Sequence, residues 1–175
     1  HLLTVNKAVI SITGTRQYDG STNALQADLS LNNLQGGENL TLTGNGIISD
    51  KNVATGKTLD VSGLTRGNGS GGPPGLSSNY KLDGGTHTFN VTKKDITFSG
   101  SRVYDGTTTV SSSDLVTNDT TSGETLTFSG SGTVSSANVQ NNQSITLGSI
   151  AIADGSGGGL ASNYNLTTGT FDISQ

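Results

Sequence analysis

Two Tyr-Asp-Gly triplets, Tyr18-Asp19-Gly20 and Tyr104-Asp105-Gly106, place a phenol beside a carboxylate. Acid–base catalysis and sugar binding both use such groups, but one isolated motif in each half of the chain makes poor catalytic machinery. The residue types instead predict a turn in which Asp accepts backbone N–H bonds and Gly adopts a positive φ, while Tyr packs its ring over the core. We therefore expect these six residues to be structural.

The other two of the four tyrosines lie in Ser-Asn-Tyr triplets, at Asn79-Tyr80 and Asn163-Tyr164. A Tyr whose hydroxyl ties a strand to a nearby loop is a known feature of β-sandwiches, and we expect this structural role. An aromatic platform on which a sugar ring stacks is the alternative.

Two glycine-rich loops carry oxygen ligands of the kind that Ca²⁺ accepts. One begins at Asn68 and the other, 86 residues later, at Asp154, and each continues as Gly-Ser-Gly-Gly. Neither loop has a second carboxylate nearby, unlike an EF-hand loop with its several acids and closing Glu. We expect flexible loops and no cofactor, with calcium at Asn68 and Asp154 as the weaker alternative.

The sequence lacks the residues that other kinds of catalytic site need. The chain has no Cys, which removes thiol nucleophiles and thiolate zinc sites. His1 and His87 are its only histidines, and Glu38 and Glu124 are its only glutamates. Because the two glutamates lie in different halves, a glycosidase pair would need an Asp from elsewhere. The sequence predicts that the protein is not an enzyme.

The composition argues against two classes of partner. The net charge is −4, and of the nine Lys and Arg only Lys93 and Lys94 adjoin, so no cationic face is available for nucleic acid. No stretch approaches the ~18 apolar residues of a membrane span, so we expect no membrane insertion. Apolar residues make up only 30% of the chain but fall in short alternating runs, which indicates thin folded cores rather than disorder.

The chain repeats itself at an offset of 86 residues, and one register is held over many positions. The second copy is slightly shorter near its end, where the two Ser-Asn-Tyr triplets are 84 residues apart. Matched pairs include Gly14 with Gly100, Arg16 with Arg102, Asp28 with Asp114, Glu38 with Glu124, and Asn52 with Asn138.

The repeat predicts the domain organisation: residues 7–92 form repeat one and residues 93–175 form repeat two. Residues 1–6 match the last strand of a repeat, so we expect them to be the end of a preceding one. No Pro-rich or Ser-rich spacer lies at the boundary, and a Gly/Ser linker is what would let the units reorient freely. We expect an elongated rod with modest hinge freedom, in which neighbouring repeats are each other's partners.

Alternation of period two recurs along both repeats, as in Ile10-Ser-Ile12 and Phe89-Asn-Val91, and predicts half-buried strands. Six or seven short strands per repeat, separated by Gly and Asn clusters, favour an all-β immunoglobulin-like sandwich. The alternative is a β-grasp-like repeat with one short helix around Ala24 to Asn33.

With both copies laid out, the chain resembles the YDG-type repeats, and the related MBG repeats, of filamentous-haemagglutinin-like adhesins of Gram-negative bacteria. The second copy departs from the pattern at residues 136–143, which lack the Asp and both Lys of the first. The matching elements are the two Tyr-Asp-Gly triplets, Gly-Glu-x-Leu-Thr-x-x-Gly at 37–44 and 123–130, Asp50-Lys51-Asn52-Val53, and Ser-Asn-Tyr-x-Leu at 78–82 and 162–166.

The resemblance implies a secreted protein displayed on the bacterial cell surface, associated with the outer membrane, in arrays that act as stalk or spacer in cell adhesion or biofilm formation. Absence of Cys is compatible with export in an unfolded state. The alternative function is an adhesive module in which exposed Thr, Asn and Tyr bind glycans of a host cell or biofilm matrix.

Overall fold

A computed structural model describes residues 4–121 and 123–175. The chain divides into two compact units, with the division between Thr92 and Lys93. Every regular element in the described residues is a β-strand or a three-residue 3-10 turn, so the prediction of an all-β protein is confirmed. No helix in this part of the chain is long and apolar enough to cross a membrane.

Repeat one contains a six-stranded sheet in the order β3-β6-β7-β10-β2-β4 and two further strand pairs, β1-β9 and β5-β8. Of the predicted end of a preceding repeat, residues 1–3 lie outside the described residues and residues 4–6 form no strand. The strands are β1 Ala8–Val9, β2 Ser11–Gln17, β3 Asn23–Ala24, β4 Leu29–Asn32, β5 Leu40–Gly44, β6 Gly46–Ile48, β7 Ala54–Asp60, β8 Leu64–Asn68, β9 Tyr80–Lys81 and β10 His87–Thr92, with the 3-10 turns η1 Gln26–Asp28 and η2 Ser77–Asn79.

Repeat two contains a four-stranded sheet in the order β13-β11-β18-β16 and two further pairs, β12-β15 and β14-β17. Its strands are β11 Lys94–Val103, β12 Thr109–Ser111, β13 Leu115–Thr117, β14 Leu126–Ser129, β15 Ser131–Thr133, β16 Gln140–Ser144, β17 Ala151–Asp154 and β18 Tyr164–Ser174, with the 3-10 turns η3 Ser112–Asp114 and η4 Ala161–Asn163.

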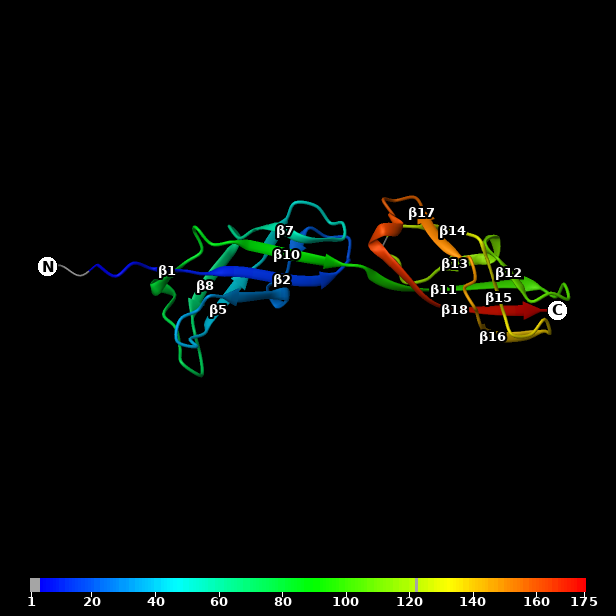
Figure 1. Ribbon diagram of the computed structural model, residues 1–175, viewed down its shortest axis with the longest axis horizontal. Coiled ribbons are helices and arrows are strands. Elements are labelled where there is room, and N and C mark those ends of the chain that lie inside the picture. The colour runs from blue at the N-terminus through cyan, green and yellow to red at the C-terminus, as the bar shows by residue number, and fades with distance from the viewer. Residues whose placement is uncertain (1–3, 122) are drawn as a thin grey trace. The chain divides into compact units, whose positions relative to one another are not determined.

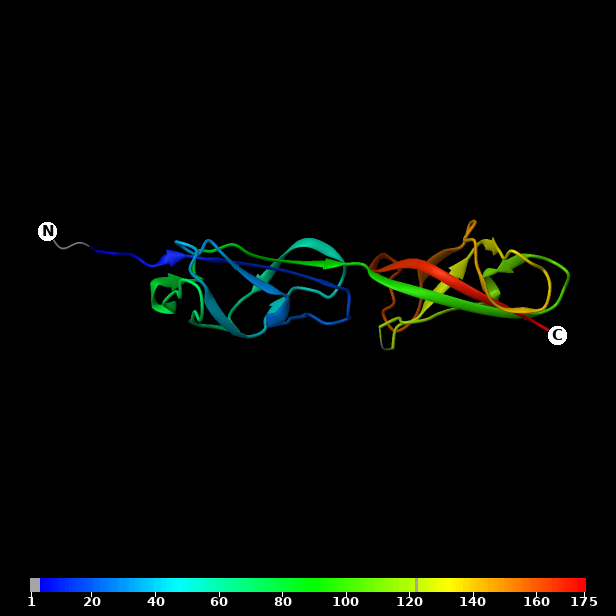
Figure 2. The ribbon, with the colours of Figure 1, turned by 90° about the horizontal axis from the view of Figure 1, so that it is seen from below.

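The long strands near the two ends of each repeat lie side by side and run in the same direction. In repeat one, β2 pairs with β10 from Ile12 opposite His87 to Gln17 opposite Thr92 (Figure 1). In repeat two, β11 and β18 pair in the same parallel way along almost their whole length (Figure 2). The chain therefore starts each repeat at one end of the parallel pair and leaves it at the other.

This topology departs from both predicted architectures. An immunoglobulin-like sandwich consists of antiparallel sheets, whereas the main sheet of each repeat contains a parallel pair, so the sandwich is not confirmed. The helix expected around Ala24 to Asn33 is wrong, because only the turn Gln26–Asp28 forms there before β4 begins. The reason is visible in Leu29-Ser-Leu31, whose alternation of period two is that of a strand.

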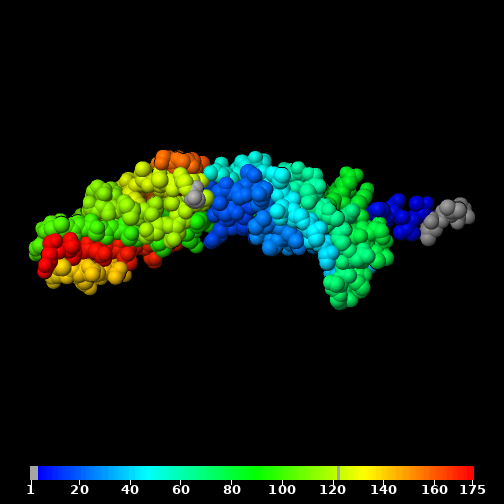
Figure 3. Space-filling view, turned by 180° about the vertical axis from the view of Figure 1, so that it is seen from behind, coloured from blue at the N-terminus to red at the C-terminus, as the bar shows by residue number. Residues whose placement is uncertain are grey.

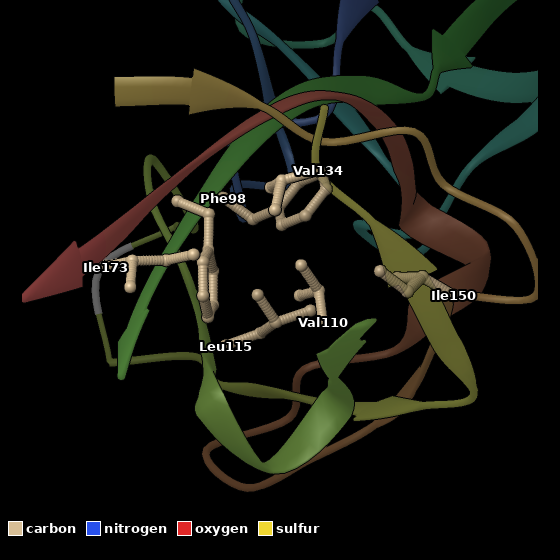
Figure 4. Packing of buried hydrophobic residues seen from close by; sticks show 7 residues of the cluster. Phe98, Val110, Leu115, Val134, Ile150 and Ile173 are labelled. Carbon is tan, nitrogen blue, oxygen red and sulfur yellow. The ribbon is translucent and has the colours of Figure 1, made fainter. Parts of the chain in front are cut away.

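The core of repeat two contains a cluster of apolar side chains that converge from several strands (Figure 4). On β11 the side chain of Phe98 faces this core, and on β18 those of Phe171 and Ile173 do. Losing a buried Phe side chain typically costs about 3–5 kcal/mol, so a core this small depends on each of its aromatic rings. Its members are Phe98, Val110, Leu115, Val134, Ile150, Phe171 and Ile173.

A glycine lies opposite the central aromatic ring of each parallel pair. Gly14 pairs with Phe89, and Gly100 pairs with Phe171. A Cβ on Gly14 would lie 2.5 Å from the Phe89 ring, and one on Gly100 would lie 2.9 Å from the Phe171 ring. The ring and a backbone carbonyl oxygen, that of Asp28 in repeat one and of Asp114 in repeat two, occupy the space of the missing side chain, which explains why both copies have glycine at this position.

We expect residues 93–175, produced alone, to fold into a β domain that melts cooperatively, because the core cluster of repeat two consists of its own residues. Circular dichroism should show a strand spectrum and one sigmoidal thermal transition. A persistently disordered product, without such a transition, would contradict two independently folding repeats.

Candidate functional site

The Tyr-Asp-Gly triplet of repeat two forms a tight turn directly after β11. One Asp105 oxygen, Oδ1, accepts hydrogen bonds from the backbone N–H and the hydroxyl of Thr107, both at 2.9 Å. Gly106 has a φ of 79°, which residues with a side chain rarely adopt. Repeat one repeats this geometry: Asp19 accepts from the N–H of Ser21 at 2.9 Å, and Gly20 also has a φ of 79°. The carboxylate and the glycine therefore shape the backbone.

An arginine two residues before each tyrosine holds the same turn from inside the repeat. The guanidinium of Arg102 donates to the backbone carbonyls of Thr107 and Thr109 and lies 3.0 Å from the Asp105 carboxylate. Its planar face covers the Phe171 ring, with 5.5 Å between the guanidinium carbon and the ring centroid. Arg102 thus connects the turn to the core.

Arg16 makes the equivalent set of interactions in repeat one. It donates to the carbonyls of Ser21 and Asn23, lies 3.0 Å from the Asp19 carboxylate and covers the Phe89 ring at 5.5 Å. Sequence reasoning missed the roles of both arginines. The available signal was that both copies have an arginine at the same place, two residues before the Tyr-Asp-Gly triplet and 86 residues apart.

The interactions of Asp105 favour its charged form. The backbone N–H of Thr107 is the main cause that holds the pKa of this carboxyl below its ordinary value of 3.8, and the charge of Arg102 adds to the effect. A carboxylate fixed in this way accepts hydrogen bonds and is a poor proton donor near neutral pH.

The two tyrosines of the triplets differ in exposure. Tyr18 is only 2% exposed, whereas Tyr104 is 52% exposed. The expectation that Tyr104 buries its ring over the core of repeat two is therefore wrong. The Tyr104 ring lies outside the core cluster, near Gly106. In repeat one the Lys51 ammonium lies over the Tyr18 ring, 5.8 Å from its centroid, and the matching residue of repeat two is the short Ala137.

The tyrosines of the Ser-Asn-Tyr triplets tie a strand to a loop. In repeat two, the Tyr164 hydroxyl donates to the Glu124 carboxylate at 2.6 Å and accepts from the Thr121 N–H at 3.1 Å. In repeat one, Tyr80 donates to Glu38 at 2.5 Å and accepts from the N–H of Gln35 at 3.0 Å. Both rings are only 1% exposed, so neither offers a platform for sugar stacking.

The asparagines before these tyrosines close the short turns that place them. The backbone N–H of Asn79 donates to the carbonyl of Leu76, and that of Asn163 donates to the carbonyl of Leu160, both at 2.9 Å. Each turn then leads directly into the strand that starts with the tyrosine.

The glutamates are the second pair of residues whose role sequence reasoning missed. Burial is the main cause that raises the pKa of Tyr164, and the Glu124 carboxylate raises it further. The Glu38 carboxylate is the main cause that raises the pKa of Tyr80. A phenol with a raised pKa stays protonated and keeps donating to its carboxylate, so the pair works as a fixed tie.

A model of the YDG domain matches the chain twice, over residues 3–88 and 88–171. The chain belongs to the YDG domain family. Searches of curated proteins and of solved structures find no match. The family resemblance expected from the motifs is thus confirmed, and two tandem YDG repeats account for nearly the whole chain.

The glycine-rich loops of the YDG repeats use their oxygen atoms internally. Asn68 accepts with Oδ1 from the backbone N–H of Ser77 at 2.9 Å, and Asp154 accepts with Oδ1 from that of Ala161 at 2.7 Å. The segment after Asn68 projects from the surface of repeat one (Figure 3). No group of three or more acidic or His side chains in the described residues could hold a metal ion. That calcium is dispensable stays a prediction.

The remaining candidates for catalysis are also engaged within the repeats. His87 accepts from the N–H of Ile12 with Nδ1 at 3.0 Å, and its Nε2 lies 3.1 Å from the carbonyl oxygen of Leu82. The two glutamates bind tyrosine hydroxyls of their own repeats. Within the described residues, the side chains of His87, Glu38 and Glu124 therefore connect loops and strands of their own repeats.

We expect Tyr164→Phe to destabilise repeat two by about 1–3 kcal/mol, because it removes the donor to a buried Glu124 while keeping the ring. Tyr80→Phe is the matched control, and its loss should be smaller because Glu38 is less buried. Urea unfolding of the two variants measures both effects. If the two variants lost equal amounts of unfolding free energy, or if neither lost any, burial would not decide the strength of the Tyr–Glu hydrogen bond.

We also expect acid to weaken the Tyr-Asp-Gly turn of repeat two. Because the pKa of Asp105 is lowered in the folded state, its contribution to stability is complete above the unfolded value of 3.8 and is lost as the pH falls through the folded value. Asp105→Asn should therefore flatten the fall of the melting temperature below about pH 4. Thermal melts between pH 7 and 2 measure this, and an unchanged acid profile in the variant would refute it.

Proposed function

We propose that these YDG repeats are spacer segments of a large secreted bacterial surface adhesin, associated with the outer membrane and active in cell adhesion or biofilm formation. The observation that carries the proposal is the parallel pairing of β2 with β10 and of β11 with β18. Because the chain enters and leaves each repeat at opposite ends of this pair, each repeat spans the length of its own parallel pair, as a spacer unit should.

The same pairing suits a segment under tension. A force applied to the two ends of repeat two pulls β11 and β18 in opposite directions along their length. Their ladder extends from Lys94 opposite Tyr164 to Val103 opposite Ser174, so its hydrogen bonds are loaded together rather than one after another. Resistance to such shear is useful in a protein that holds a cell to a surface.

The side chains support a structural role better than a chemical one. The carboxylates of Asp105 and Glu124, the guanidinium of Arg102 and the hydroxyl of Tyr164 all bind groups of their own repeat. The proposal accordingly includes no catalytic activity, cofactor or nucleic-acid partner, and no insertion into a membrane.

A glycan-binding or matrix-binding module is the second candidate, and one observation favours it. The Tyr104 ring is half exposed beside a carboxylate, and aromatic rings with a polar neighbour suit sugar recognition. The equivalent ring of Tyr18 is buried, so such a site would exist in only one of the two repeats.

A glycan array probed with the two-repeat protein separates the candidates. We expect no saturable binding, because a spacer presents no dedicated ligand site. A saturable signal that Tyr104→Ala abolishes and Val116→Ala preserves would establish the glycan-binding function instead. Val116 is the matched control because it is also an exposed apolar residue of repeat two.

A further inference from the structure

His87 joins three segments of repeat one through its backbone and its two ring nitrogens. It begins β10, and its Nδ1 accepts a hydrogen bond from the backbone N–H of Ile12 on β2 at 3.0 Å. Its Nε2 lies 3.1 Å from the carbonyl oxygen of Leu82, in the turn that leads from β9 to β10. The imidazole therefore holds this turn against β2.

These two partners fix the protonation state of the ring. A ring nitrogen that accepts from a backbone N–H carries no proton, so Nδ1 is the unprotonated nitrogen. Nε2 then carries the single proton of a neutral imidazole and donates a hydrogen bond to the Leu82 carbonyl. A second proton would have to bind Nδ1, where it would face the N–H of Ile12, donor against donor.

No carboxylate compensates for a positive charge on this ring. Among the described residues, both hydrogen-bond partners of His87 are backbone groups. The turn itself is held by uncharged groups, since the N–H of Gly85 donates to the Leu82 carbonyl and that of Thr86 donates to the Ser11 hydroxyl. The charged residues on the elements around the ring are Arg16 on β2, which pairs with Asp19, Lys57 on β7, which pairs with Asp50, Asp60 on β7, which accepts from the N–H of Ser62, and the exposed Lys81 on β9 and Asp83 in the turn.

Repeat two has no titratable group at this position. Gly169 pairs with Phe98 there, as His87 pairs with Ile12 in repeat one. A Cβ on Gly169 would lie 2.3 Å from the Phe98 ring, so this ring fills the space that an imidazole would need. His1 and His87 are the only histidines of the chain, so repeat two contains none. The two copies therefore differ in the side chain that ordinarily changes its charge between about pH 5 and 8.

We propose that His87 is a pH-sensitive switch, whose protonation in mild acid releases the turn at residues 82–86 from β2 and loosens repeat one alone. The folded repeat holds the ring neutral, whereas the unfolded chain accepts a second proton freely. The unfolded state therefore binds more protons in acid. The stabilising contribution of His87 is complete above about pH 7 and is lost as the pH falls through the range in which imidazoles gain a proton. The inference goes beyond the spacer function and does not depend on it.

The released contact lies at one end of the parallel ladder. Ile12 opposite His87 is the first pair of the ladder between β2 and β10, and the Ile12 residue is fully buried. Protonation of Nδ1 leaves the N–H of Ile12 without its acceptor, and an unpaired buried donor destabilises the folded state. We therefore expect the ladder to open first at this end, where the turn enters β10.

NMR spectroscopy of the two-repeat protein tests both the protonation state and its energetic consequence. Long-range ¹H–¹⁵N spectra of the imidazoles at about pH 7.5 should show His87 as a neutral ring with its proton on Nε2. Urea unfolding, followed through resolved backbone signals, reports the two repeats separately. Between about pH 7.5 and 5 we expect the urea midpoint of repeat one to fall by about 0.5–1 M and that of repeat two to stay nearly constant. The acid effect expected at Asp105 lies below this range.

Two variants assign the effect to one ring. His87→Asn supplies an amide oxygen that can accept from the N–H of Ile12 and does not titrate, so the midpoint of repeat one should no longer depend on pH over this range. His1→Asn is the matched control, because it removes the other histidine and should keep the pH dependence. A proton on Nδ1 of His87 at about pH 7.5, an equal fall of both midpoints, or an unchanged fall in His87→Asn would each overturn the proposal. If His87→Asn prevents repeat one from folding, the tautomer and the comparison of the two repeats in the unaltered protein decide.

Discussion

The parallel ladder between the long strands near the two ends of each repeat is the constraint on which the rest depends. It sets Gly14 opposite Phe89 and Gly100 opposite Phe171, so that each ring lies where a side chain would otherwise be. The ring in turn supports the guanidinium of the arginine two positions further along the neighbouring strand. The same guanidinium donates hydrogen bonds to backbone carbonyls of the turn and forms an ion pair with the Asp of the Tyr-Asp-Gly triplet. A repeat with antiparallel terminal strands would lose this chain of contacts, and its two ends would lie together.

The two copies connect the same pair of segments through different kinds of side-chain interaction. In repeat one, Lys57 is buried and its ammonium lies 2.7 Å from Asp50. At the matching positions of repeat two, the buried Gln143 accepts with its side-chain oxygen from the backbone N–H of Ser136 at 3.1 Å. An ion pair and a neutral hydrogen bond thus connect the same two segments. Each repeat therefore gives the buried side chain at this position a partner, because a buried polar group without one is costly, although the Gln143 amide nitrogen has none among the described residues.

Sequence reasoning found the elements that depend on local patterns and missed those that depend on distant pairing. Alternation of period two identified the strands, the offset of 86 residues identified the two copies, and the motifs that recur in them identified the family. Alternation is the same in parallel and antiparallel strands, so it could not reveal how β11 and β18 pair. Glu124 precedes Tyr164 by 40 residues, and nothing local connects them before the fold does. The expected burial of Tyr104 failed for a related reason, since a turn motif specifies its backbone and leaves the surroundings of its ring open.

In the Tyr-Asp-Gly triplet, the geometry of the turn is therefore separate from the surroundings of the tyrosine ring. Asp105 and Gly106 shape a turn that is complete within one repeat, because their partners are the backbone and hydroxyl of Thr107 and the nearby Arg102. Tyr104 contributes its backbone N–H to the last strand through Ser174, but its ring is half exposed and lies outside the core cluster, whereas the ring of Tyr18 is buried. Lys51 lies over the Tyr18 ring in repeat one, whereas the matching residue of repeat two, Ala137, is too short to cover the ring of Tyr104 in the same way. The contribution of the tyrosine ring to stability therefore depends on the side chains that other segments place beside it, while the aspartate and glycine form the same turn in both repeats.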